Sequence, residues 1–130
     1  MLDFRIETRS HVVPYLQLVE QVRQALRTGL LEPGDRLPTV REVAESVSIN
    51  PNTVLKAYRQ LEHEGLVEGR PGQGTFVIGS LAGPSLGSHA ALRRQLRTWL
   101  HAARNAGLEP EDIEALFDTT MHAVESEEIA

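Results

Sequence analysis

The chain has 130 residues, 41% of them hydrophobic and 24% charged, which is typical of one globular domain or of a small domain with an appendage. The absence of cysteine excludes disulfides, thiolate zinc sites and thiol nucleophiles. The formal net charge is −5. No apolar run is long enough to span a membrane, and the N-terminus alternates apolar and charged residues, unlike a signal peptide, so we expect a cytoplasmic protein.

The acidic charge is concentrated towards the C-terminus. Residues 1–78 carry nine Arg or Lys and ten Asp or Glu, whereas residues 79–130 carry four and eight. DNA affinity depends on a local basic face rather than on the total charge. The net charge therefore leaves DNA binding by the first part of the chain open.

Two helices are predicted first. Pro14 suits a first helical position, and apolar residues then recur at helical spacing as far as Leu26. Pro33-Gly34-Asp35 is predicted to form a turn. Thr39-Val-Arg-Glu42 forms a capping-box pattern that starts a second, short helix ending near Val47.

A third helix and a hairpin follow. Asn50 can cap a helix whose first turn accepts Pro51, and Gly65 closes it. Two strands are predicted over residues 66–69 and 74–78, joined through residues 70–73, where glycines permit positive φ. Three helices followed by such a hairpin are the layout of a winged helix-turn-helix, in which the hairpin is the wing.

The rest of the chain is predicted to be a linker and two amphipathic helices. Residues 79–88 have a linker composition, the fourth helix ends at Gly107, and the fifth begins near Pro110. The fold class is thus mainly α (α+β), with a DNA-binding domain at 1–78, a linker at 79–88 and a two-helix segment at 89–130.

These two helices are too short to bury both apolar stripes by themselves. We expect a homodimer in which paired helices form a small bundle; the alternative is that the pair packs back on its own winged helix. The expected dimerisation residues are Leu92, Leu96, Trp99, Leu100, Leu116 and Phe117.

The third helix carries residues that could read DNA in the major groove. Asn52, Lys56 and Arg59 share a face away from the apolar stripe, and such side chains bond base edges or phosphates. The wing could approach the minor groove. The expected DNA-binding residues are Arg36, Thr39, Arg41, Asn50, Asn52, Thr53, Lys56, Arg59, Arg70, Gly72 and Gln73. The alternatives are that the third helix carries only a cap and a solvated face, and that the wing is an ordinary tight hairpin.

Residues 31–77 resemble the GntR family of bacterial transcriptional regulators. The resemblance is carried by Leu31-x-Pro-Gly-Asp-Arg-Leu-Pro, Arg41-Glu-Val-Ala, Asn52-Thr-Val, Leu61-Glu-x-Glu-Gly-Leu and Gly72-Gln-Gly-Thr-Phe-Val. Ile49-Asn-Pro-Asn-Thr-Val, Lys56-Ala-Tyr and the short tail are similar to the YtrA subfamily.

The resemblance implies DNA contacts at positions including Arg41, Asn50 and Gly72, and control of ABC-type transporter genes and of the regulator's own operon. Many members of the family carry arginine where this chain has Pro51, so base reading must shift to neighbouring residues.

The sequence favours neither catalysis nor a bound metal. None of the five histidines forms an i, i+4 pair with another, and no nucleophile is paired with a base. We expect no enzyme activity and no cofactor. The expected partners are double-stranded DNA, a second copy of the chain and a small-molecule effector of unknown identity. The alternative function is a winged-helix module that binds protein without sequence-specific DNA binding.

Overall fold

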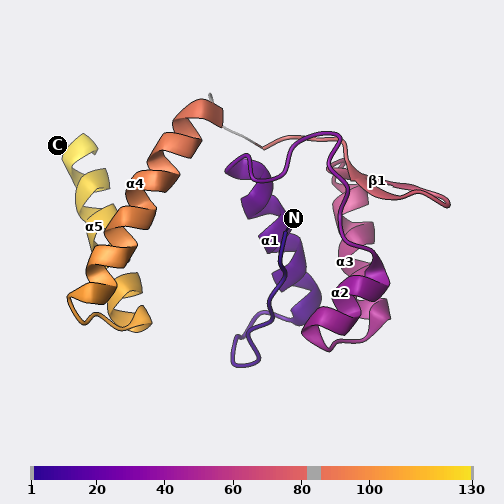
Figure 1. Ribbon diagram of the computed structural model, residues 1–130, viewed down its shortest axis with the longest axis horizontal. Coiled ribbons are helices and arrows are strands. Elements are labelled where there is room, and N and C mark those ends of the chain that lie inside the picture. Colours follow the sequence, from indigo (N-terminus) through magenta and orange to yellow (C-terminus); the bar gives the residue numbers. More distant parts are fainter. Residues whose placement is uncertain (1, 82–85, 130) are drawn as a thin grey trace. The chain divides into compact units, whose positions relative to one another are not determined.

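The structure is a computed structural model that describes residues 2–81 and 86–129. Figure 1 shows its helices and strands in chain order. The chain divides into two compact units, Met1–Leu86 and Gly87–Ala130.

The first unit contains three helices, α1 (Pro14–Arg27), α2 (Val40–Val47) and α3 (Pro51–His63). The predicted helix starts are confirmed. Pro14 opens α1, Thr39 forms both halves of a capping box with Glu42, and the Asn50 side chain caps α3. These local signals need no tertiary contact, which explains why the sequence located them.

The core of the first unit lies where α1 and α2 pack against α3. Each helix contributes an apolar stripe at helical spacing, and the N-terminal segment adds Phe4. The largest fully buried side chains are Leu18, Leu26, Leu37, Leu61, Val19, Val22, Val43, Val54, Val67 and Val77. This core fixes α3 so that its opposite face is exposed.

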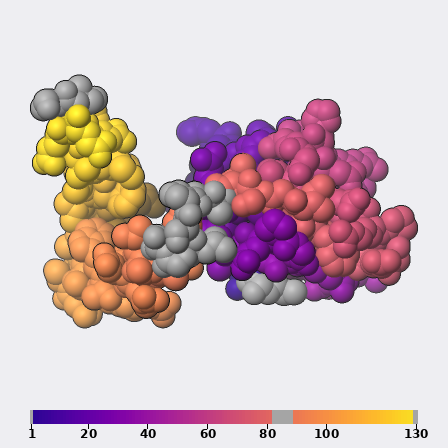
Figure 2. Space-filling model, turned by 90° about the horizontal axis from the view of Figure 1, so that it is seen from above, coloured from indigo at the N-terminus to yellow at the C-terminus, as the bar shows by residue number. Residues whose placement is uncertain are grey.

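The wing consists of β1 (Val67–Arg70) and β2 (Gly74–Val77), paired antiparallel. β1 is shifted by one residue at both ends from the predicted 66–69, so Arg70 lies in the strand rather than in the connection, and β2 ends one residue before the predicted 78. The glycines at 72 and 74 have φ values of 74° and 124°, as their positions in the turn require. The hairpin projects from the body of the first unit (Figure 1), and its residues lie on the surface in the space-filling view (Figure 2).

A further segment pairs with the outer edge of β2. Gly34 N donates to Val77 O at 2.8 Å, Val77 N donates to Asp35 O at 2.8 Å, and Leu37 N donates to Thr75 O at 2.9 Å. The sequence had indicated only a turn at 33–35. The pairing ties the segment that leads into α2 to the wing.

The second unit contains α4 (Leu86–Asn105) and α5 (Pro110–Ile129). The expectation that residues 79–88 are all linker is wrong at its end, because α4 begins at Leu86; residues 82–85 lie outside the described residues. Gly87 was assigned to the linker by composition, but a glycine within a helix costs only about 1 kcal/mol relative to alanine. No helix among the described residues is long and apolar enough to cross a membrane.

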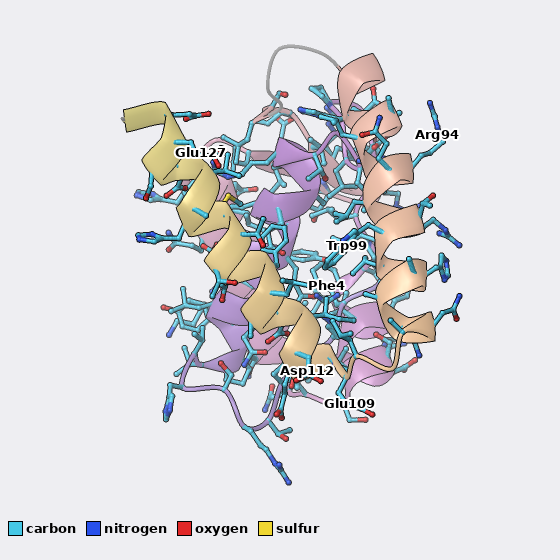
Figure 3. The ribbon with its side chains drawn as sticks, turned by 90° about the vertical axis from the view of Figure 1, so that its left-hand side faces the viewer. Phe4, Arg94, Trp99, Glu109, Asp112 and Glu127 are labelled. Carbon is cyan, nitrogen blue, oxygen red and sulfur yellow. The ribbon has the colours of Figure 1, made fainter. Side chains whose placement is uncertain are left out.

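Figure 3 shows α4 and α5 meeting at the turn near Glu109 and diverging from it. Trp99 points to the side of α4 that faces α5, whereas Arg94 points away. The turn contains Gly107 at φ 92°, and Glu109 N donates to Asp112 Oδ2 at 3.0 Å. The apolar faces of the two helices are thus presented on the inside of an open V.

Candidate nucleic-acid interface

The exposed face of α3 carries three of the predicted DNA-binding residues. Asn52, Lys56 and Arg59 are exposed, and Thr53 beside them is half-buried. Val54, Ala57, Tyr58 and Leu61 are buried on the opposite face. Within the described residues, the side-chain amide of Asn52 and the guanidinium of Arg59 have no hydrogen-bond partner, so both are available to an incoming ligand.

Asn50 has a structural role at the start of this helix. Its Oδ1 accepts a hydrogen bond from Asn52 N at 2.8 Å. The same contact satisfies an amide that would otherwise lack an intrahelical partner. Asn50 therefore fixes the first turn of α3, and its Nδ2 group is the part left for a ligand.

Lys56 is held over an aromatic ring of another helix, a contact that the sequence did not predict. Its Nζ lies 4.1 Å from the centroid of the Tyr15 ring, at the start of α1. A cation over an aromatic face gains about 0.5–1 kcal/mol at an exposed site. The contact directs the ammonium along the edge of α3, where a phosphate is a more accessible ligand than a base.

Tyr58 positions the start of α2 relative to α3. Its hydroxyl donates to the carbonyl of Pro38 at 2.5 Å, and both residues are buried. Burial, with a smaller contribution from the charge of Glu42, raises the pKa of Tyr58, so the phenol stays protonated and remains a donor. The bond fixes Thr39 and exposed Arg41, in the first turn of α2, beside the recognition face of α3.

Several predicted residues from different elements line one groove beside the turn of the wing. The groove has a volume of about 590 Å³. Its lining comprises Arg36, Thr39, Gly69, Arg70, Pro71, Gly72, Gln73, Gly74 and Thr75. Five of the predicted DNA-binding residues, from the lead-in of α2 and from the wing, therefore meet here: Arg36, Thr39, Arg70, Gly72 and Gln73.

The two arginines of this groove are braced against the wing. A Cβ placed on Gly74 would lie 2.8 Å from Arg36 Nε, so the Arg36 side chain occupies the space that the glycine leaves open. Arg70 stacks over the Phe76 ring at 4.4 Å and pairs with Glu68 at 3.2 Å. Both guanidinium groups are oriented before any ligand binds.

An ion pair outside this face joins α1 to the end of α3. Arg23 donates to both carboxylate oxygens of Glu64, at 2.9 and 2.6 Å, and also contacts Glu20. The Arg23 guanidinium holds the pKa of the Glu64 carboxyl below its usual value, and the pairing raises the pKa of Arg23. These charges stabilise the helix packing and are not part of the candidate interface.

The second unit presents apolar rather than polar surface. Trp99 is 37% exposed and Phe117 is 44% exposed, although both lie on the inner faces of the V. A groove of about 320 Å³ runs between α4 and α5 and is lined by Leu96, Trp99, Leu116, Phe117, Thr120, Met121 and Val124. Across the part of the chain that the structure describes, no group of three or more His, Cys, Asp or Glu side chains is placed to hold a metal ion.

Comparison with known proteins agrees with this arrangement. The model of the family "Bacterial regulatory proteins, gntR family" matches residues 14–77. The HTH-type transcriptional repressor YtrA of Bacillus subtilis is 36% identical over 110 residues, which cover 84% of this chain and 85% of that protein.

Solved structures are similar as well. YtrA from Sulfolobus acidocaldarius, described as a GntR-family transcription factor, superposes with a TM-score of 0.54 at 29% identity, covering 77% of this chain and 95% of that one. The DNA-binding domain of AraR in complex with operator ORX1 has a TM-score of 0.52 at 26% identity and covers 58% of this chain and 95% of that one. The chain therefore belongs to the GntR family and is a DNA-binding transcriptional regulator.

Proposed function

We propose that the protein is a cytoplasmic repressor that binds a palindromic operator as a homodimer. The observation that carries the proposal is the exposed polar and basic side chains on α3 and at the start of α2, together with a groove of the wing lined by Arg36 and Arg70. Its similarity to the YtrA repressor over most of both chains supports repression. Occupancy of an operator that overlaps a promoter would exclude RNA polymerase.

The geometry suggests a division of roles within this surface. We assign base reading to Asn52, with Thr53 and Arg59 beside it, because short or forked donors on an exposed helix face suit base edges. Lys56 and Arg36 are assigned to phosphates, since each side chain is held along the rim of the surface.

The remaining candidates are assigned to the backbone or to the minor groove. Arg41, Asn50 and Thr39 lie at helix starts, where amides and donors suit a phosphate. Arg70, Gly72 and Gln73 belong to the wing and would approach the minor groove or its phosphates.

The second unit would supply the dimer contact. The exposed apolar residues inside the V are Leu92, Leu96, Trp99, Leu116, Phe117, Met121 and Val124, and Leu100 beside them is half-buried. In addition, α4 carries four arginines and no acidic residue, whereas α5 carries seven acidic residues and neither lysine nor arginine. A second copy would cover the apolar faces and bring opposite charges together. Residues 1–78 would then be the DNA-binding domain and the two-helix segment the dimerisation domain.

Two measurements test this proposal. Selection from random duplexes by the purified protein is expected to enrich a palindrome whose half-sites lie about one helical turn apart. Sedimentation is expected to show a dimer that dissociates in Leu96→Ala/Trp99→Ala but not in the outward-pointing control Arg94→Ala. A dimer that survives the double substitution would refute the role of the second unit.

The resemblance of the sequence to the YtrA subfamily is the ground on which we also propose regulation of ABC-type transporter genes and of the protein's own operon. A small-molecule effector that lowers the affinity of the protein for DNA would release this repression. The selected operator sequence can be searched for beside transporter genes, and its absence there would refute this assignment.

A further inference from the structure

The N-terminal segment is bound to α1 through two glutamine side chains. Gln21 accepts from Arg5 N at 3.0 Å and donates to Arg5 O at 2.7 Å. Gln17 does the same for Glu7, at 2.8 and 3.1 Å. Phe4, just before Arg5, is buried in the core, and Ile6, between Arg5 and Glu7, packs against it. Each glutamine amide thus makes the pair of backbone hydrogen bonds that a neighbouring β-strand would make, and it keeps the segment extended along α1.

The loop that follows, residues 7–12, is fixed at both ends by one side chain. Gln17 Nε2 donates to Val12 O at 2.8 Å as well as to Glu7 O. Inside the loop, Ser10 N donates to Glu7 O at 3.2 Å and Val12 N donates to Ser10 Oγ at 3.0 Å. A loop held in this way loses little conformational entropy when it binds a partner.

The chemistry of the loop is that of an anion-binding surface. Residues 8–19 contain Arg9 and His11 and no Asp or Glu. Arg9, Ser10 and His11 are exposed. Among the described residues, neither Arg9 nor His11 takes part in an ion pair. The side-chain carboxylate nearest in sequence is that of Glu7, whose backbone forms the base of the loop.

The helix that follows the loop is linked to the DNA-binding face by one contact. Tyr15, three residues after Val12, holds the Lys56 ammonium of α3 over its ring. Figure 1 shows the loop at the end of the first unit where α2 leads into α3, the end that carries Asn52. The loop that carries Arg9 and His11 therefore lies at the same end of the first unit as the start of α3, away from the wing (Figure 1).

We propose that this loop is a further DNA-contacting element, in which Arg9, with His11 and Ser10, binds backbone phosphate outside the base-read half-site. Gln17 is a positioning residue that holds the loop in its binding conformation. The inference rests on the proposed function. The wing would contact the backbone on one side of α3 and the loop on the other, which fixes the tilt of the recognition helix in the groove.

The test measures the affinity of purified variants for the selected duplex and for one of scrambled sequence, over a range of salt concentrations. Arg9→Ala is expected to weaken both about three- to tenfold and to reduce the slope of log K against log salt by about 0.9. The matched control is Arg27→Ala, which removes an exposed arginine from the last turn of α1. It is expected to change neither quantity.

Gln17→Leu separates positioning from contact. Its loss of affinity is expected to be smaller in the Arg9→Ala background, because the loop then positions only His11 and Ser10. Unchanged salt slopes for Arg9→Ala, or additive effects of the two substitutions, would overturn the inference while leaving the proposed function intact. If the wild-type protein bound neither duplex, the proposed function would fail first.

Discussion

Removal of the Tyr58 hydroxyl tests how α2 is held against α3. Phenylalanine keeps the ring in the core and deletes only the donor to Pro38 O. The net value of such a hydrogen bond is about 1 kcal/mol, and leaving the buried carbonyl unpaired raises the cost to about 1–3 kcal/mol. For a unit of this size, each kcal/mol lowers Tm by about 4–8 °C.

The assay is urea unfolding of Tyr58→Phe followed by far-ultraviolet circular dichroism, with Tyr15→Phe as the control. The Tyr15 hydroxyl has no hydrogen-bond partner among the described residues, and the substitution keeps the ring that Lys56 contacts. We expect a lower midpoint with an unchanged dependence on urea for Tyr58→Phe alone. If both variants unfolded at the same urea concentration, the role given to the buried hydroxyl would be refuted.

Three further outcomes follow from particular contacts. The pKa of Glu64 is lowered in the folded state, so its ion pair stabilises the fold fully at pH values above the unfolded-state pKa of about 4.3, by at most about 1 kcal/mol. This stabilisation is lost as the pH falls through the folded-state pKa. Glu64→Gln should therefore flatten that part of a curve of unfolding against pH. Thr39→Ala should lower the free energy of unfolding by about 1 kcal/mol through loss of the capping box, and Thr39→Ser should retain most of it. Gly74 has a φ of 124° and a Cβ there would clash with Arg36, so Gly74→Ala should destabilise the wing by about 1–3 kcal/mol in thermal unfolding. Gly72→Ala should cost less, because the space around Gly72 is open. Equal losses for the two variants would contradict the clash with Arg36 as the cause.

The sequence predicted what local chemistry determines. Pro14, Thr39 and Asn50 mark helix starts because each acts on amides within its own first turn. The turn glycines at 72 and 74 were identified because their positive φ values arise within the hairpin. The candidate DNA-binding residues of α3 could be assigned to one exposed face from helical periodicity alone.

Contacts between distant segments were missed because they leave no periodic signal. No sequence pattern near Gly34–Leu37 predicts that this segment pairs with β2. The contact between Lys56 and Tyr15 joins residues forty-one positions apart in the chain. One signal was available. The apolar residues at 2, 4 and 6 alternate as in a strand with one buried face, and this pattern could have predicted the extended segment that packs on α1.

The most direct test of the central claim compares the base preferences of wild-type protein and Asn52→Ala on the selected operator. The account predicts a loss of about 1–3 kcal/mol on the best site and relaxed preference at one position of each half-site. Arg36→Ala, the phosphate-contact control, should weaken all sequences alike. Unchanged base preference in Asn52→Ala would contradict the assignment of α3 as the reading element, and failure of the wild-type protein to enrich any duplex would favour a winged helix that binds protein.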